Sequence, residues 1–402
     1  MTRSSNADGI PARDGAPAPD VDVVCLGESM VTFLPRRPGR LADVPSFDRA
    51  IGGAESNVAC TLARTGHTAR WISRVGTDGF GDHLLAAIAD YGVDVTHVRR
   101  DPLRPTGIYF RTADDRATDT HEVAYYRTGS AASAMTAAHL DQDAIHSGRI
   151  LHLSGITAAL SENCLGLMRE LTARRPGRPL LSFDVNHRPG LWREPSRAQA
   201  LLELARGADL VFVGDDEARD AWGLHGAHAI SEALPEPDLL VVKQGRRGAT
   251  VFQRTTETGA RRGDATGPAT DTATFVPSLN VDLVAATGAG DAFAAGFLSA
   301  TLRALPVGTR IRHGHLWAAA ALTVPGDLAT PPGRAHADRL ADLDDAAWGR
   351  LHLGPGWTEV AASGHRVDAS GHRGDAAGQR ADASGQRAGA SGRRADEEVR
   401  TP

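Results

Sequence analysis

Short apolar runs recur along the chain, and each ends in or beside glycine, aspartate or asparagine. Runs of about four to seven apolar residues with such ends are typical of buried β-strands. This pattern covers residues 21–28, 67–76, 149–155, 179–185, 208–214 and 238–245. Other stretches place apolar residues three and four positions apart, which is the spacing of one helix face. The helices predicted in this way cover residues 55–66, 79–92, 196–208 and 290–305.

The alternation of strands and helices predicts an α/β fold of three layers, in which helices flank a mostly parallel sheet. Residues 106–129 break this pattern, because apolar and polar residues alternate there on both sides of an acidic turn. Such alternation is typical of an antiparallel hairpin with one solvated face. We therefore expect a small β lid that includes about residues 104–130. Ligands of such folds gather beyond the carboxyl ends of the parallel strands, so polar residues there are candidates for function.

Both ends of the chain differ in composition from this central part. Residues 1–20 are rich in Ala, Pro, Gly and Asp and lack the apolar segment of a secretory signal. From Ala362 onward, units related to ASGHRVD repeat without the apolar spacing of a coiled coil. We therefore expect disordered segments at 1–20 and 361–402, on either side of one domain at 21–360.

Composition narrows the class of protein. Of the 402 residues, 41% are hydrophobic and 23% charged, which is ordinary for a globular protein. No apolar stretch reaches the roughly 18 residues of a membrane-spanning helix. The net charge of −5 gives no reason to expect nucleic acid or an anionic membrane as a partner. Cys25, Cys60 and Cys164 are far apart, so we expect neither disulfides nor a cysteine zinc site, and a reduced cytoplasmic location.

Lys243 is the single lysine among 44 lysine and arginine residues. The Walker A loop of many nucleotide enzymes needs lysine directly before serine or threonine, whereas Lys243 lies in VVKQG. Any nucleotide site in this chain is therefore not a P-loop. A lone lysine can be chemically required or can be left by codon bias, and the sequence leaves both explanations open.

The strongest candidate for chemistry is the segment Thr287–Asp291, at the start of a predicted helix. Small residues before a helix let main-chain N–H groups converge on an anion, assisted by the helix dipole. Asp291 is either an ordinary helix-capping residue or a general base beside a phosphate site. Capping alone does not explain the three small residues that precede it, so we favour the second interpretation.

Three further segments carry polar residues where they can reach a ligand. Loop 51–57 has two glycines ahead of a helix, segment 182–189 follows a predicted strand, and the hairpin holds most of the tyrosines. Each has an ordinary explanation as well: a capped loop, a surface arginine, or aromatic packing within strands. Hydroxyls beside guanidinium groups also suit a polyol that carries a carboxylate. The residues concerned are Gly53, Asn57, Tyr109, Tyr125, Tyr126, Arg127, Asp184, Asn186 and Arg188.

Two of these segments together resemble the signatures of the ribokinase-like, or PfkB, family of sugar kinases. GGAESN before a small-residue helix, and TGAGDAFAAGF near the C-terminus, follow the family's order across roughly residues 21–348. Within that family, RVGTDGFGDHL, LHLSGIT, YYRTGSAAS and FDVNHRPGLW are similar to 2-keto-3-deoxygluconate kinases. The resemblance implies that ATP, with Mg²⁺, phosphorylates a sugar hydroxyl while the lid excludes water.

The resemblance also implies roles for single residues and an assembly. Asp291 would be the catalytic base, and the anion hole would be Gly288, Ala289 and Gly290. The substrate would be held by Gly53, Asn57, Tyr109, Tyr125, Arg127 and Arg188, together with Asp291. ATP would lie against Asn186, Lys243, Gly245, Gly248, Gly288 and Gly290. The family further implies a homodimer formed through the lid.

Two positions depart from the family pattern. Ala285 stands where the family often has an aspartate, which argues against activation by potassium. Gly214 replaces the asparagine of an Asn-x-x-Glu motif whose glutamate is kept as Glu217. Glu217 would therefore contact magnesium weakly or through water. Neither change removes the base or the anion hole, so an active enzyme is still expected.

The sequence thus predicts a cytoplasmic kinase that converts 2-keto-3-deoxygluconate, or a close relative, to its 6-phosphate. Arg127 and Arg188 would contact the sugar carboxylate. One alternative is a kinase for a neutral sugar such as fructose or ribose, which needs no cationic lid. Another is a non-catalytic sugar or nucleotide sensor of the same fold, suggested by the two departures.

Overall fold

The computed structural model describes residues 19–37, 39–112, 122–192, 195–256 and 269–359. All of these belong to one compact unit of the chain. The repeat tail predicted at 361–402, and nearly all of the arm predicted at 1–20, lie outside the described residues. Within those ranges, no helix has both the length and the apolar character needed to cross a membrane.

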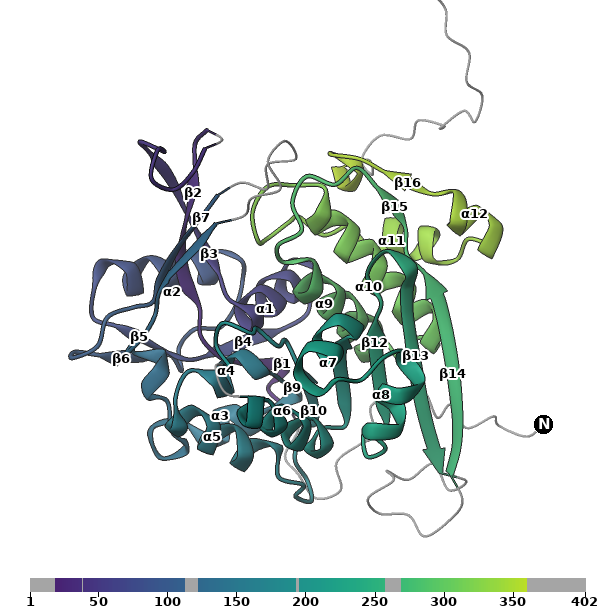
Figure 1. The fold of residues 1–402 in the computed structure, drawn as a ribbon, viewed down its shortest axis with the longest axis horizontal. Coiled ribbons are helices and arrows are strands. Elements are labelled where there is room, and N and C mark those ends of the chain that lie inside the picture. The colour runs from purple at the N-terminus through teal and green to yellow at the C-terminus, as the bar shows by residue number, and fades with distance from the viewer. Residues whose placement is uncertain (1–18, 38, 113–121, 193–194, 257–268, 360–402) are drawn as a thin grey trace, which may run out of the picture. The chain divides into compact units, whose positions relative to one another are not determined.

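An eight-stranded sheet forms the centre of the fold, in the order β14-β13-β12-β11-β10-β9-β1-β4 (Figure 1). Neighbouring strands are parallel from β4 to β12, while β13 and β14 pair antiparallel at one edge. The strands are β1 (Val21–Leu26), β4 (Ala69–Ile72), β9 (Gly148–Ser154), β10 (Leu180–Asp184), β11 (Leu210–Gly214), β12 (Leu239–Lys243), β13 (Gly248–Thr256) and β14 (Ala269–Pro277). Every apolar run identified in the sequence contributes a strand, which confirms the prediction of a mostly parallel sheet.

Helices cover both faces of this sheet. Successive residues of a strand point to opposite faces, so Val23 and Cys25 join one apolar cluster while Val24 and Leu26 join another. The first cluster is completed by α1 (Ala54–Arg64), α2 (Gly79–Asp90), α9 (Ala289–Leu302), α10 (Val307–Leu322), α11 (Arg334–Ala341) and α12 (Asp345–Arg350). The second is completed by α3 (Gln142–His146), α4 (Gly155–Ala159), α5 (Glu162–Thr172), α6 (Pro195–Gly207), α7 (Asp215–Trp222) and α8 (Ala227–Ala233). The predicted three-layer α/β fold is therefore confirmed.

A second sheet of four strands, the lid sheet, has the order β3-β2-β7-β8 and lies beside α2 (Figure 1). Its strands are β2 (Met30–Pro35), β3 (Phe47–Gly52), β7 (Ile108–Arg111) and β8 (Val123–Tyr126). Two further sheets have two short strands each: β5 (Arg74–Gly76) with β6 (Arg99–Asp101), and β15 (Asn280–Val281) with β16 (His352–Leu353). Strands β7 and β8 are the predicted hairpin, whereas β2 and β3 were not predicted. The rings of Phe33, Phe110 and Tyr126 pack on one face of the lid sheet. Tyr109 pairs with Tyr125 across the other face.

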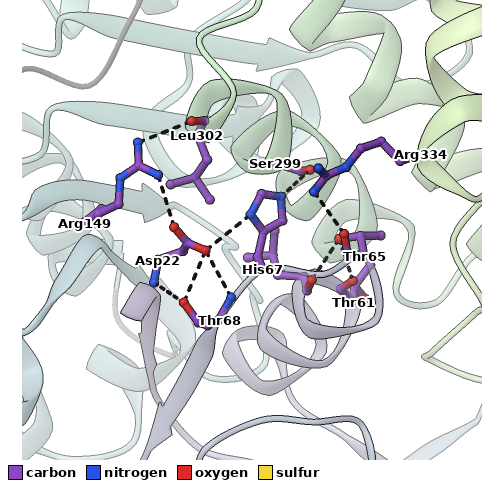
Figure 2. A network of polar contacts seen from close by, with 10 residues as sticks. Asp22, Thr61, Thr65, His67, Thr68, Arg149, Ser299, Leu302 and Arg334 are labelled. Atoms are coloured by element: carbon purple, nitrogen blue, oxygen red, sulfur yellow. Dashed lines mark hydrogen bonds and ion pairs between the residues drawn. The ribbon is translucent and has the colours of Figure 1, made fainter. Parts of the chain in front are cut away.

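Helices α1 and α9 lie side by side and are joined near both ends. Near their N-termini, the Asn57 amide donates a hydrogen bond of 2.8 Å to the Asp291 carboxylate. Beyond the C-terminus of α1, the His67 imidazole Nε2 lies 2.8 Å from the hydroxyl of Ser299 in α9 (Figure 2). Side-chain contacts thus join the two helices near both ends. Their N-termini face the carboxyl ends of the parallel strands.

Candidate active site

A cavity of about 560 Å³ lies where the carboxyl ends of the sheet strands meet the N-termini of α1 and α9, under the lid sheet. This volume is in the usual range for small-molecule sites. The lining combines acidic, basic, amide and phenolic side chains with several glycines. The main lining residues are Glu28, Gly53, Asn57, Tyr109, Arg111, Tyr125, Arg127, Asp184, Asn186, Arg188, Glu217, Lys243, Thr287, Gly288, Gly290, Asp291 and Asp327.

Asp291 lies in the first turn of α9, at the floor of this cavity. Burial raises the pKa of its carboxyl to about 7, and the negative charge of Asp184 acts in the same direction. The hydrogen bond from Asn57 and the positive charges of Arg188 and Lys243 oppose this shift only in part. A carboxyl with a pKa near neutrality can accept a proton from a substrate hydroxyl and release it again.

Main-chain geometry prepares the N-terminus of α9 for an anion. Gly288 caps the helix in the left-handed region at φ 78°, and a Cβ there would lie 2.2 Å from the main-chain oxygen of Asp327. Only glycine fits this position without strain. The first N–H groups of a helix have no partner within it, so those after Gly288 are available to a phosphate.

Lys243 forms a charged cluster with the carboxylates of Asp184 and Glu217 beside the N-terminus of α9. The Lys243 ammonium lies 3.1 and 3.0 Å from the two oxygens of Asp184. Burial lowers the pKa of Lys243, but the charges of Asp184 and Glu217 outweigh it and raise the pKa overall. The pKa of Glu217 is itself raised by burial, although the Gly214 N–H donates to its carboxylate at 2.8 Å. The lone lysine is therefore kept charged where phosphates would arrive.

Asn186 follows β10 and has a positive φ of 41°, which is uncommon for a residue other than glycine. Its amide oxygen is buried and has no hydrogen-bond partner among the described residues. Together with the carboxylates of Asp184 and Glu217, it supplies oxygen ligands of the kind that Mg²⁺ prefers. No group of three or more His, Cys, Asp and Glu within the described ranges could hold a metal alone. A Mg²⁺ ion here would need phosphate or water ligands as well.

The two arginines expected at a substrate carboxylate differ in their surroundings. Arg127 is buried and forms an ion pair with the equally buried Glu28, whose other oxygen accepts a hydrogen bond from Ser130. Arg188 has a side chain that is 52% exposed and lies 3.4 Å from Glu217. Arg188 is thus the more available of the two for a new ligand.

Most of the site residues that the family resemblance implies lie around this one cavity, but three of them do not. Ala289 does not line it, although Gly288 and Gly290 on either side do. Gly245 and Gly248 also stand outside the lining, in the turn that connects β12 to β13. Both have positive φ values, 55° and 140°, so a tight turn accounts for these glycines.

Sequence reasoning missed three charged residues that line the cavity. Asp327 lies in the segment after α10, where its carboxylate accepts from the Tyr109 hydroxyl at 2.7 Å and pairs with Arg111 at 3.0 Å. These partners are more than 200 positions apart, so no local pattern indicates them. Glu28 could have been found, because it lies two residues after a buried strand, on the side where ligands gather.

The model of the pfkB family of carbohydrate kinases matches residues 20–332. The chain therefore belongs to the PfkB family of carbohydrate kinases, as the resemblance indicated. It is 33% identical over 325 residues to the 2-dehydro-3-deoxygluconokinase of Bacillus subtilis, which covers 78% of this chain and 93% of that protein. It is also 31% identical to the probable chloroplastic fructokinase-6 of Arabidopsis thaliana, over 71% of each chain.

Solved structures agree with this assignment. A PfkB protein from Polaromonas sp. JS666 matches with a TM-score of 0.67 and 35% identity, covering 79% of this chain and 99% of that one. An uncharacterized sugar kinase from Pyrococcus horikoshii, solved with ATP, matches with a TM-score of 0.65 and 25% identity over 81% and 98% of the two chains. The protein is a carbohydrate kinase, and relatives of two substrate classes are similar to it.

Proposed function

We propose that this kinase transfers the γ-phosphoryl group of ATP to the primary hydroxyl of 2-keto-3-deoxygluconate or a closely related sugar acid. The observation that carries the proposal is the cavity itself, where the carboxylate of Asp291 and the half-exposed guanidinium of Arg188 share one lining. A proton acceptor and a cation in one cavity match the two ends of such a substrate. The similarity to a 2-dehydro-3-deoxygluconokinase over most of the chain supports the same substrate.

In the proposed reaction, Asp291 takes the proton of the attacking hydroxyl while that oxygen forms a bond to the γ-phosphorus. The bond from this phosphorus to the bridging oxygen breaks, and ADP leaves with the electron pair. The N–H groups after Gly288 and the ammonium of Lys243 stabilise the charge that develops on the transferred group. Magnesium, when bound with ATP, neutralises phosphate charge, and Asp184, Asn186 and Glu217 are the residues that would hold it.

A kinase for a neutral sugar is the second candidate, and one contact favours it. Glu28 already neutralises Arg127, so the buried part of the lid presents less free positive charge than the sequence suggested. The similarity to a fructokinase supports this alternative as well. The two candidates share Asp291 as the base and residues 288–290, the anion loop, and they differ in whether Arg188 contacts a substrate carboxylate.

The test compares Arg188→Ala with the wild type, using 2-keto-3-deoxygluconate and fructose as acceptors and ADP release as the signal. We expect the KM for the sugar acid to rise by about 10- to 100-fold, since a charged hydrogen bond is worth roughly 1.5–3 kcal/mol. Arg49→Ala is the matched control, because Arg49 is exposed on β3 of the lid sheet. Equal losses for the acid and the neutral sugar would remove the sugar-acid assignment.

Two further expectations belong to this proposal. A homodimer formed through the lid sheet is supported by its aromatic face, where Tyr126 is 64% exposed. A cytoplasmic location is supported by Cys25, Cys60 and Cys164, which are all buried free thiols. A light-scattering mass at micromolar concentration tests the first, and fractionation of the native cells tests the second.

A further inference from the structure

Arg111 lies on the face of β7 that carries Tyr109, and it reaches across to two other segments. One terminal nitrogen of its guanidinium lies 3.0 Å from the Asp327 carboxylate. The other lies 3.2 Å from the hydroxyl of Thr287, which directly precedes the anion loop at Gly288. A single side chain of the lid sheet therefore contacts both the Asp327 segment and the loop that would receive the phosphoryl group.

Asp327 is also in direct contact with the anion loop and with the lid. Its main-chain oxygen packs against Gly288 so closely that no side chain fits between them. Its carboxylate fills the space beside Gly52 at the end of β3, where a Cβ would lie 2.5 Å from an oxygen of Asp327. The carboxylate also accepts the hydrogen bond from Tyr109. Movement of Asp327 would therefore be passed directly to the anion loop.

The ion pair is buried, with 4% of the Arg111 side chain and 7% of the Asp327 side chain exposed. Burial of two charges costs free energy that their attraction often fails to recover, so stability alone is a weak reason for such a pair. A planar guanidinium can hold two acceptors at fixed positions, which a lysine cannot do. Arg111 therefore has the geometry needed to fix the distance between Asp327 and Thr287.

We propose that Arg111 is a positioning residue, which holds the lid sheet to the anion loop through Asp327 and Thr287 and thereby sets the loop for phosphoryl transfer. The inference rests on the kinase reaction proposed above, but not on which sugar is the acceptor. Loss of Arg111 would leave Asp291, Asn57 and Arg188 in place, because Arg111 contacts none of them. The anion loop would lose its alignment and the cavity would admit water.

The experiment compares Arg111→Gln and Arg111→Lys with the wild type and with Arg49→Gln, the same change at an exposed lid position. We expect Arg111→Gln to lower kcat by about 10- to 100-fold, because a misplacement of about 1 Å can cost that much. The KM for the sugar should stay within about threefold, and the ratio of phosphorylated sugar to ADP should fall below one. Arg111→Lys should recover part of kcat, since it restores the charge near Asp327.

Hydrogen exchange of the ligand-free proteins gives a readout that does not depend on turnover. Arg111→Gln should speed exchange in both 108–111 and 285–290, whereas Arg49→Gln should not. An unchanged kcat with unchanged exchange would overturn the proposal, and so would a selective rise in the KM of the sugar, which would make Arg111 a substrate ligand. If no sugar is phosphorylated by the wild type, the proposed function fails, and the exchange data alone decide whether Arg111 joins the two segments.

Discussion

Each end of the α1–α9 helix pair lies beside a partly buried aspartate, and the surroundings shift the pKa values of the two carboxyls in opposite directions. At the cavity end, Asp291 accepts a hydrogen bond from Asn57, and burial raises its pKa to about 7. At the far end, burial also raises the pKa of Asp22, but hydrogen bonds from Thr68 and Arg149 and the charge of His67 outweigh it and lower the pKa (Figure 2). A carboxylate with its full set of partners stabilises the fold, whereas one left short of them keeps its proton affinity for chemistry.

Replacement of each aspartate in turn should give the largest effects, on turnover for Asp291 and on the free energy of unfolding for Asp22. Asp291→Asn removes the proton acceptor, so kcat should fall by about 10²- to 10⁴-fold. Binding of ATP, followed by calorimetry, should persist because the anion loop remains. Asp22→Asn is the matched control: it should keep turnover and lose about 1–3 kcal/mol of unfolding free energy with its hydrogen bonds. Retained turnover in Asp291→Asn would instead mean that another group accepts the proton.

The pH dependence of kcat/KM tests the proton affinity of Asp291. The base must be deprotonated, so activity should fall about tenfold for each pH unit below about 7. The hydrogen bond from Asn57 lowers this pKa. Asn57→Ala should therefore move the acidic limb of the profile to higher pH. A limb that stays in place in this variant would mean that another group sets the profile.

The smallest expected effect lies at the far end, at His67. Burial lowers the pKa of this imidazole, although Asp22 opposes the shift. Between the folded pKa and the ordinary value of 6.5, the unfolded chain binds more protons, so stability should fall as the pH falls through about 6.5. Urea unfolding at pH 8 and pH 5 should show a smaller pH dependence in His67→Gln than in the wild type. At pH 8 the variant should lose about 1 kcal/mol with the Ser299 contact.

Local patterns were sufficient for the parallel strands, because each is buried on both faces and reads as an apolar run. They failed for β2 and β3, because the exposed Asp48 and Arg49 interrupt the apolar residues of β3 and β2 ends at Pro35. At the site, Asp291 and Gly288 could be predicted, because the small residues and the start of the helix are next to each other in the sequence. The Glu28–Arg127 and Arg111–Asp327 ion pairs could not be predicted. The local sequence does not distinguish an arginine paired with a distant carboxylate from one that is free to bind a ligand.

The hydrogen bond between Asn57 and Asp291 has a consequence for the order in which this protein matures. Its two residues are 234 positions apart, so the contact cannot form until most of the chain has been synthesised. Contacts of such long separation are also slow to form, because a large loop must close before they are made. A nascent chain that ends before α9 lacks both Asp291 and part of the apolar cluster on one face of the sheet, so it cannot yet consume ATP. The general base and the covering of this face of the sheet therefore come with the same helix, α9.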